Sequence, residues 1–272
     1  ASGCIGTLLR DAGQQKEFED LLIRRGDPIP ADAPGPIYIC TRNDDLDAVI
    51  AACPEEKRDD LVFLQTGQLE PIRQRYGLYD TTQAVLWLAL LRVGGRPVDG
   101  ITSDAPDGLT SVSGKWSGAL AQRLERAGCK CVEYGAQREL RRNMLEKLVW
   151  ISSVMLAGAV HGGISIGEVE KKHREEVEDL VVELATFCRF TLSVALKTGL
   201  EERLCEYSRL MEFVPCELRE FEWRNGWFYK YSLMAGPRKV AGGATIDVPD
   251  ATPMHTEYIL RARDMGLLSQ AD

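Results

Sequence analysis

The chain has 272 residues, 44% of them hydrophobic, with a formal net charge of −8 and a pI near 5.1. This length allows one large domain or two ordinary domains, each with a sizeable core. The acidic balance argues against a protein that binds nucleic acid or an anionic membrane surface. The longest apolar stretches, residues 84–91 and 148–160, are too short to cross a bilayer, so we expect a soluble protein without a transmembrane segment.

The first six residues, Ala1-Ser-Gly-Cys-Ile-Gly6, are similar to the end of a glycine-rich dinucleotide-binding loop. The full fingerprint is a strand, then G-x-G-x-x-G, then a helix whose first amides hold the pyrophosphate. Gly3 and Gly6 stand at the second and third glycine positions, so we expect a nucleotide-binding domain truncated at its first strand. Two glycines also occur in strand-turn-helix units that bind no nucleotide.

Two arginines follow at the distance where such domains recognise the ribose of the cofactor. Residues 20–24 are a short apolar run that predicts a strand ending at Arg24 and Arg25. An acidic residue at this place binds the ribose of NAD, whereas arginine accommodates the 2′-phosphate of NADP. The pair therefore predicts NADP, and a solvated basic pair at the end of a strand is the alternative.

Strands and helices alternate in the next part of the chain. Residues 36–41 and 61–64 predict buried strands, residues 44–53 a helix between them, and residues 81–93 a strand with an extension. Such alternation builds a mostly parallel sheet whose ligands lie at the carboxyl ends of the strands. Those ends carry Arg42, Thr66 and Gly67, which we add to the candidate cofactor-binding residues.

The pattern changes after residue 100. A hairpin or loop over residues 101–114, an amphipathic helix over 115–127 and a last strand over 129–134 come first. Segments with helical periodicity follow at 140–159, 166–190, 200–207 and 257–265. We therefore expect an α/β, Rossmann-type dinucleotide-binding domain over residues 1–136 and an α-helical domain over residues 137–272.

The eight cysteines lack the paired C-x-x-C arrangement that holds zinc, and Cys129-Lys-Cys131 lies in an expected strand. We interpret the cysteines as reduced packing residues and expect no metal site. A reducing compartment is consistent with them, either the cytoplasm or the interior of an organelle such as a plastid or mitochondrion. No targeting segment is recognised that would choose between these.

Five short motifs occur along the chain in a fixed order: the glycines at 3 and 6, Ile23-Arg24, Ile39-Cys-Thr-Arg42 followed by Leu46-Asp-Ala-Val49, Leu61-Val-Phe-Leu-Gln-Thr-Gly67, and Glu146-Lys147-Leu148. Together they resemble the ketopantoate reductase family, a branch of the 6-phosphogluconate-dehydrogenase-like superfamily of NADP-dependent oxidoreductases. The resemblance extends from residue 1 to about residue 190. It implies NADP as the cofactor and a small 2-keto or related carbonyl compound as the substrate.

The resemblance also implies catalytic roles. Lys147 stands where the family has the lysine that donates a proton to the substrate oxygen. A lysine desolvated in such a site can act as acid and base; a solvated helix lysine is the alternative. Glu257, within His255-Thr256-Glu257, is similar to the family's carboxylate that orients the substrate hydroxyl, although His255 also fits a surface histidine.

A helix break at His161 is not explained by the resemblance. Residues 159–167 interrupt a helical pattern with three glycines, and Ser165 and Glu168 form the pattern of a capping box at the start of the next helix. We consider His161 a candidate proton donor or ligand-binding group in the catalytic site. The alternative is a connector in which the glycines only make the turn.

Two functions remain open. The first is an NADP-dependent reductase of a small carbonyl compound. The second is a non-catalytic Rossmann-fold descendant that serves as a structural or nucleotide-sensing subunit of a larger protein complex. Four departures from the family favour the second: the broken glycine loop, the missing first strand, and Thr66 and Ile151, which each stand where the family has an asparagine. Lys147 and the arginines favour the first.

Overall fold

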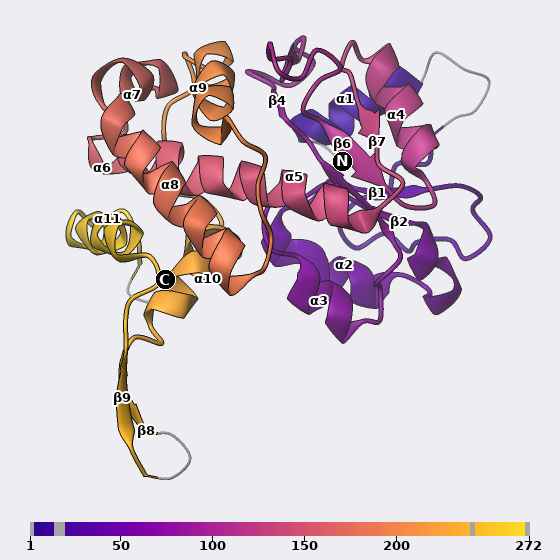
Figure 1. Ribbon diagram of the computed structural model, residues 1–272. Helices are drawn as coiled ribbons and strands as arrows, with labels where there is room; N and C mark the ends of the chain where they lie inside the picture. The colour runs from indigo at the N-terminus through magenta and orange to yellow at the C-terminus, as the bar shows by residue number, and fades with distance from the viewer. Residues whose placement is uncertain (1–2, 14–19, 240–242, 270–272) are drawn as a thin grey trace. The chain divides into compact units, whose positions relative to one another are not determined.

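The structure is a computed structural model that describes residues 3–13, 20–239 and 243–269. The chain divides into two compact units, Ala1–Met144 and Leu145–Asp272 (Figure 1). The division falls inside helix α5, Gln137–Trp150, whereas the sequence places the boundary at residue 136, just before that helix.

The first unit is built on a five-stranded sheet with the strand order β1-β2-β3-β6-β7. β1, β2 and β3 are parallel, β6 is antiparallel to β3, and β7 is parallel to β6. This mostly parallel sheet confirms the expected α/β fold. The strands are β1 Ile37–Ile39, β2 Leu61–Phe63, β3 Thr82–Val85, β6 Ser111–Ser113 and β7 Val132–Glu133, and a separate pair is formed by β4 Leu88–Ala89 and β5 Val98–Asp99.

Helices cover both faces of this sheet (Figure 1). On one face α1, Cys4–Gly13, and α4, Ser117–Arg126, pack on alternate strand residues, because successive strand side chains point to opposite faces. That core contains Leu9, Val62, Leu64, Ala84, Leu86, Val112, Leu120, Leu124 and Cys129. On the other face lie α2, Leu46–Ala52, and α3, Glu70–Arg75, with short 3₁₀ segments at Asn43–Asp45 and Glu55–Asp60.

Gln83 of β3 connects the sheet to helices α3 and α5. Its side-chain oxygen accepts a hydrogen bond of 2.7 Å from Arg73 of α3, and its amide nitrogen lies 3.3 Å from the sulfur of Met144 in α5. One buried polar side chain therefore ties a strand to two helices of the first unit.

The strand predicted over residues 20–24 is wrong. This segment has no regular secondary structure, and the side chain of Leu21 is 64% exposed. Without burial of its apolar side chains nothing compensates for ordering the segment as a strand. It is held by polar contacts instead: Asp20 forms an ion pair of 2.6 Å with Arg123 of α4.

The second unit is mainly helical, as expected. It contains the C-terminal part of α5, a π-helical turn at Ile151–Met155, a 3₁₀ segment at Phe221–Trp223, and the helices α6 Leu156–Val160, α7 Ile166–Lys172, α8 Arg174–Thr191, α9 Leu200–Leu210, α10 Asn225–Ser232 and α11 Pro253–Asp264. The capping box predicted from Ser165 and Glu168 is confirmed at the start of α7.

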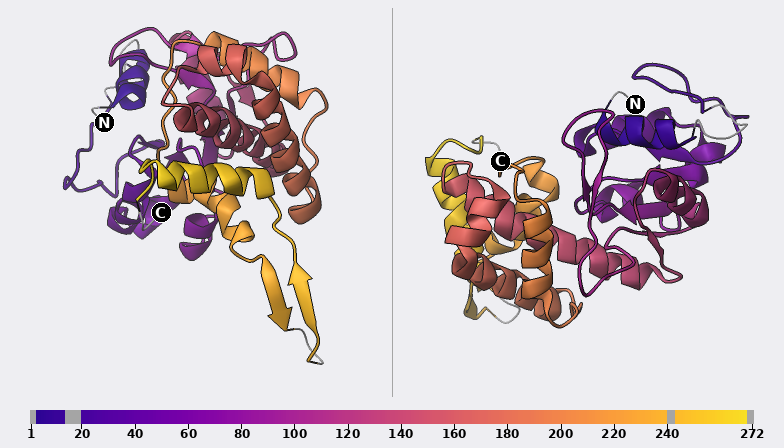
Figure 2. Two further views of the ribbon diagram at one scale, coloured as in Figure 1. Left: turned by 90° about the vertical axis from the view of Figure 1, so that its left-hand side faces the viewer. Right: turned by 90° about the horizontal axis from the view of Figure 1, so that it is seen from above.

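A hairpin within this unit was not expected from the sequence. Strands β8, Gly236–Lys239, and β9, Thr245–Val248, pair antiparallel and extend away from the helices of their unit (Figure 2). Six of the eight residues in the two strands are exposed, so no alternation of buried apolar residues marks them in the sequence.

The helical stretch Gln137–Val160 is long and apolar enough to cross a membrane by length and composition. Nearly all of the most apolar 18-residue segment of this stretch is buried within the protein, as in the core helix of a folded domain. All eight cysteines are free, and five of them are buried, in agreement with the expected packing role.

Candidate functional site

The loops after β1 and β2 are joined by side-chain hydrogen bonds at the carboxyl edge of the sheet. The Gln65 amide donates to the carbonyl oxygens of Ile39 and Thr41 at 2.9 and 3.1 Å. The Asn43 amide donates to the carbonyl oxygen of Thr66 at 2.9 Å. Ligands of parallel α/β sheets bind at this edge. The hydrogen bonds between the two loops fix the loops relative to each other there.

The arginines expected at the cofactor lie near the same edge, although the strand before them is absent. The carboxylate of Asp27 accepts a hydrogen bond of 2.8 Å from the backbone amide of Arg24, which fixes the turn. Arg25 then contacts both carboxylate oxygens of Asp45, at 2.8 and 2.9 Å. Because Asp45 shortly follows Arg42, the structure brings the arginine turn close to the loop that carries Arg42.

Arg25 therefore differs from the other two arginines. Its charge is compensated by Asp45, although its side chain is 86% exposed. Arg24 and Arg42 are both exposed. A phosphate group would have to replace Asp45 to bind Arg25, which makes Arg24 and Arg42 the stronger candidates.

The two glycines of the N-terminal motif stand at the start of α1. The carbonyl oxygen of Gly3 accepts a hydrogen bond of 2.9 Å from the amide of Thr7, so Gly3 begins the helical hydrogen bonding. Gly6 is buried in the first turn. The first amides of a helix have no partner within the helix, and its dipole favours an anion beside them. This turn is thus chemically suited to a phosphate.

Gly67 follows Thr66 in the loop after β2. It is buried and adopts a φ of 139°, a conformation that other residues rarely take. Thr66 is half-buried, and its carbonyl oxygen is the acceptor for Asn43. Thr66 is therefore part of the contact between the loop after β1 and the loop after β2.

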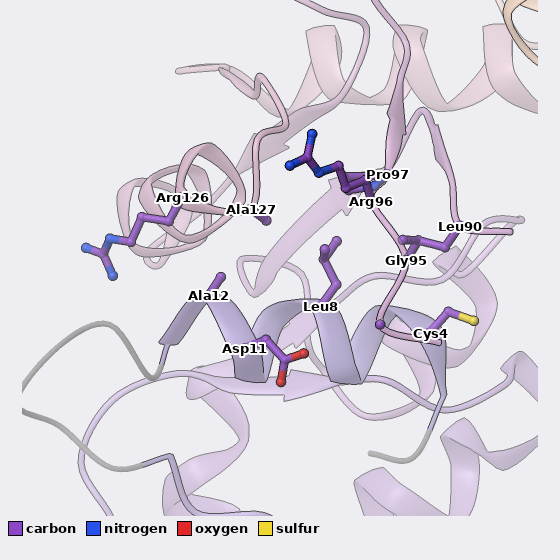
Figure 3. Close-up of a pocket in the computed structure, with 11 residues that line it drawn as sticks. Cys4, Leu8, Asp11, Ala12, Leu90, Gly95, Arg96, Pro97, Arg126 and Ala127 are labelled. Carbon is purple, nitrogen blue, oxygen red and sulfur yellow. The ribbon is translucent and has the colours of Figure 1, made fainter. Parts of the chain in front are cut away.

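A pocket of about 200 Å³ opens on the first unit along the flank of α1 (Figure 3). Leu8 and Ala12 point toward the segment that contains Arg96 and Pro97 and toward Ala127, whereas the guanidinium of Arg126 points away. The residues that line this pocket include neither Thr66 nor Gly67. We therefore do not assign the dinucleotide to this pocket.

Lys147 is buried on α5, with 7% of its surface exposed. Burial, and secondarily the positive charge of Arg224, lower the pKa of Lys147 to about 7. The solvated helix lysine that the sequence left open is therefore wrong. A lysine with this pKa is divided between its ammonium and amine forms near neutrality, so it can both give and take a proton.

Arg224, the cation whose charge acts on Lys147, is itself mostly buried. It forms an ion pair of 2.5 Å with Glu220, and both side chains are largely buried. Burial lowers the pKa of Arg224, while the carboxylate of Glu220 opposes the shift. Glu220 has a φ of 50°, in the left-handed region that a non-glycine residue occupies at a cost.

The residue one turn after Lys147 is Ile151, which is buried and begins the π-helical turn Ile151–Met155. The hydroxyl of Ser153 donates to the carbonyl oxygen of Val149 at 2.8 Å within this turn. Single π-helical turns inside α-helices are frequent at functional sites. The adjacent serines at 152 and 153 in an apolar helix were the signal that sequence reasoning passed over.

Glu257 and His255 lie on opposite sides of α11. Glu257 is exposed. His255 is fully buried, and its Nε2 lies 3.0 Å from the side-chain oxygen of Asn225. Burial, opposed by the charge of Asp250, lowers the pKa of His255 to about 3, so the ring is neutral. The surface position that the sequence allowed for His255 is wrong.

His161 lies in a polar cluster of the second unit. Its ring stacks on that of His173, with centroids 3.6 Å apart. The Nε2 of His161 and the Nδ1 of His173 each lie 2.9 Å from a carboxylate oxygen of Glu176, and the hydroxyl of Tyr258 donates to the same carboxylate. Although burial raises the pKa of Glu176, these hydrogen bonds outweigh it and lower the pKa to about 2.

The fold is similar to that of solved dehydrogenases and reductases. A PanE/ApbA family ketopantoate reductase from Ralstonia eutropha is 15% identical over 87% of this chain and 78% of its own, with a TM-score of 0.59. D-mandelate dehydrogenase in a ternary structure with NADH and anilino(oxo)acetate is 12% identical over 86% and 78%, with a TM-score of 0.57. A 2-dehydropantoate 2-reductase from Methylococcus capsulatus is 12% identical over 88% and 78%, with a TM-score of 0.54.

No protein-family profile and no curated protein sequence matches the chain. At these identities the similarity to solved structures establishes the fold. It is the Rossmann-type α/β fold followed by an α-helical part that the sequence predicts.

Proposed function

We propose that the protein is an NADP-dependent reductase of a small 2-keto or related carbonyl compound. The observation that carries this proposal is Lys147, a buried lysine of α5 whose pKa is lowered to about 7 by burial and, secondarily, by the charge of Arg224. Similarity to D-mandelate dehydrogenase, which was solved with NADH and an oxo acid, supports the cofactor class and the substrate class.

Lys147 has the properties of the proton donor in such a reaction. A nicotinamide cofactor, when bound, supplies the hydride that reduces the carbonyl carbon. The carbonyl oxygen then needs one proton to become a hydroxyl, and the ammonium group of Lys147 provides it. Because the pKa of Lys147 is near 7, the group releases and regains a proton easily at neutral pH.

Arg224 is the group that we assign to the carboxylate of a 2-keto acid. A guanidinium binds a carboxylate through two parallel hydrogen bonds and fixes its orientation. Arg224 is already held by Glu220, which defines its position before substrate arrives; as at Arg25, a ligand carboxylate would have to compete with this partner. Its charge near Lys147 also favours an anionic substrate over a neutral one.

The first unit offers residues that fit a dinucleotide. The first turn of α1, with Gly3 and Gly6, suits the pyrophosphate, and Thr66 and Gly67 lie in the loop at the carboxyl end of β2. Arg24 and Arg42 are the groups that we assign to the 2′-phosphate, with Arg25 in a secondary role. Glu257 and His161 stay predictions as catalytic residues.

Oxidation of NADPH by the full chain with a panel of 2-keto acids tests the proposal. Activity with a carboxylated substrate, and weaker activity with the corresponding neutral ketone, is the expected result. Binding of NADPH without oxidation by any member of the panel contradicts the reductase and leaves a nucleotide-sensing subunit as the function.

A further inference from the structure

We propose that His161, His173 and Glu176 form a binding site for a divalent transition-metal ion, with zinc as the ion that fits best. The site lies in the second unit, and the argument for it does not rest on the reductase function. The donor atoms are one imidazole nitrogen from each histidine and one carboxylate oxygen from Glu176, and all lie within 4.8 Å of one another.

The local chain path brings these side chains together. His161 ends α6, and the next two residues, Gly162 and Gly163, have φ values of 93° and 73°, which reverse the chain. After α7, His173 stands between the end of that helix and the start of α8, and Glu176 follows in the first turn of α8. The i, i+3 spacing of His173 and Glu176 places both on one side of this helix start.

The donor atoms already converge. The Nε2 of His161 and the Nδ1 of His173 each face a different oxygen of Glu176 at 2.9 Å. Ligand atoms of a tetrahedral zinc ion lie roughly 3.4 Å apart, given metal–ligand distances of about 2.0–2.2 Å. The donor atoms thus lie near the spacing that a metal ion needs, and we infer that side-chain rotation would let the ion take the place of the protons in these hydrogen bonds.

Tyr258 completes the arrangement around the carboxylate. Its hydroxyl donates a hydrogen bond to Oε2 of Glu176, and its ring lies 4.9 Å from the guanidinium carbon of Arg261. Residues that orient a metal-binding carboxylate in this way typically contribute 10- to 100-fold to metal affinity. The tyrosine comes from α11, so the site joins the end of α6, the junction of α7 and α8, the first turn of α8, and α11.

The donor set favours zinc over magnesium or calcium. Two imidazoles and one carboxylate suit zinc, copper and nickel, whereas magnesium and calcium prefer oxygen ligands alone. Three protein ligands also leave a fourth position for water or an exogenous ligand. His255, the third histidine of the chain, is fully buried and contacts Asn225, so it does not compete for the ion.

Calorimetric titration of the chelator-treated full chain with Zn²⁺ tests the site. We expect one Zn²⁺ per chain, at least tenfold weaker binding in His173→Gln and Glu176→Gln, and no saturable binding of Mg²⁺. Glu178→Gln is the matched control, because this carboxylate also lies on α8 but pairs with Arg174, and it should bind zinc as the wild type does. Unchanged affinity in both His173→Gln and Glu176→Gln would overturn the proposal.

A spectroscopic measurement on the wild-type chain does not depend on the folding of any variant. Electron paramagnetic resonance of one equivalent of Cu²⁺ should show coupling to imidazole nitrogen, and the Co²⁺ complex should lack the charge-transfer absorption of thiolate ligands. Tyr258→Phe should weaken zinc binding by about 10- to 100-fold while the nitrogen coupling remains. A copper spectrum without nitrogen coupling, or a cobalt spectrum with thiolate absorption, places the metal elsewhere and ends the proposal.

Discussion

Lys147 is buried close to Arg224, and burial together with the charge of this arginine lowers the pKa of the lysine to about 7. Burying one cation near another is unfavourable for stability, because neither charge is solvated as it is in water. Groups with such shifts concentrate at functional sites, where the altered pKa serves the reaction.

Replacing Lys147 by methionine should lower turnover by about 10²- to 10⁴-fold, since a positioned proton donor contributes that much to the transition state. The apolar stem of the side chain is kept, so packing changes little. The affinity for NADPH should remain nearly unchanged in a fluorescence titration. Lys230→Met, an exposed lysine of α10, is the control and should keep full turnover. Turnover that is indifferent to Lys147→Met would show that another group supplies the proton.

The same lysine predicts how stability depends on pH. Between about pH 7 and pH 10.5 the unfolded chain keeps a proton on Lys147 and the folded chain does not. The contribution of Lys147 to the free energy of unfolding therefore increases with pH in this window, by about 1.4 kcal/mol per pH unit. Urea unfolding of wild type and Lys147→Met at several pH values isolates this contribution. A constant difference between the two proteins across the window contradicts a lowered pKa.

Part of the strand order of the first unit could be read from the sequence, because turn residues bound β1 and β2. β6 lies within residues 101–114, which were expected as a hairpin or loop, and neither β6 as a strand of this sheet nor α3 was predicted. β1 and β2 are short apolar runs between turn residues, and all residues of β2 are buried, as continuous apolar strands of a covered parallel sheet are. The segment 20–24 also contains a run of apolar residues, but most of its side chains are exposed. Composition alone does not say whether a short apolar run finds a surface to pack against, so this prediction failed.

The sites of the second unit lay largely beyond sequence reasoning. Arg224 affects Lys147 from a distant part of the chain, and Tyr258 reaches Glu176 from α11. Such contacts depend on helix packing, for which spacing along the sequence gives no rule. The spacing of His173 and Glu176 was a local signal, since three residues along a helix return to the same side. His161 was singled out for its helix break, but its partners appear only in the structure.

Arg24 and Arg42 predict a preference for NADPH over NADH. Replacing both by alanine should weaken NADPH binding by about 1.5–3 kcal/mol, the usual range for a hydrogen bond to a charged group, and leave NADH binding nearly unchanged. Arg25→Ala should have a smaller effect, because Asp45 already pairs with this arginine. Calorimetric titration with both cofactors measures the difference. Equal affinities of the wild-type chain for NADPH and NADH would remove the assignment of these arginines.

His255 predicts loss of stability in mild acid. Burial holds its pKa at about 3, whereas the ring in the unfolded chain takes a proton near pH 6.5. Between pH 6.5 and pH 3 the unfolded chain is protonated at His255 and the folded chain is not. As the pH decreases through this range, the contribution of His255 to the free energy of unfolding therefore falls by about 1.4 kcal/mol per pH unit. His255→Gln keeps a donor toward Asn225 and cannot titrate, so its stability should fall less steeply than that of the wild type between pH 6.5 and pH 4.5. Parallel stability profiles of the two proteins in this range would mean that His255 is accessible to protons in the folded state.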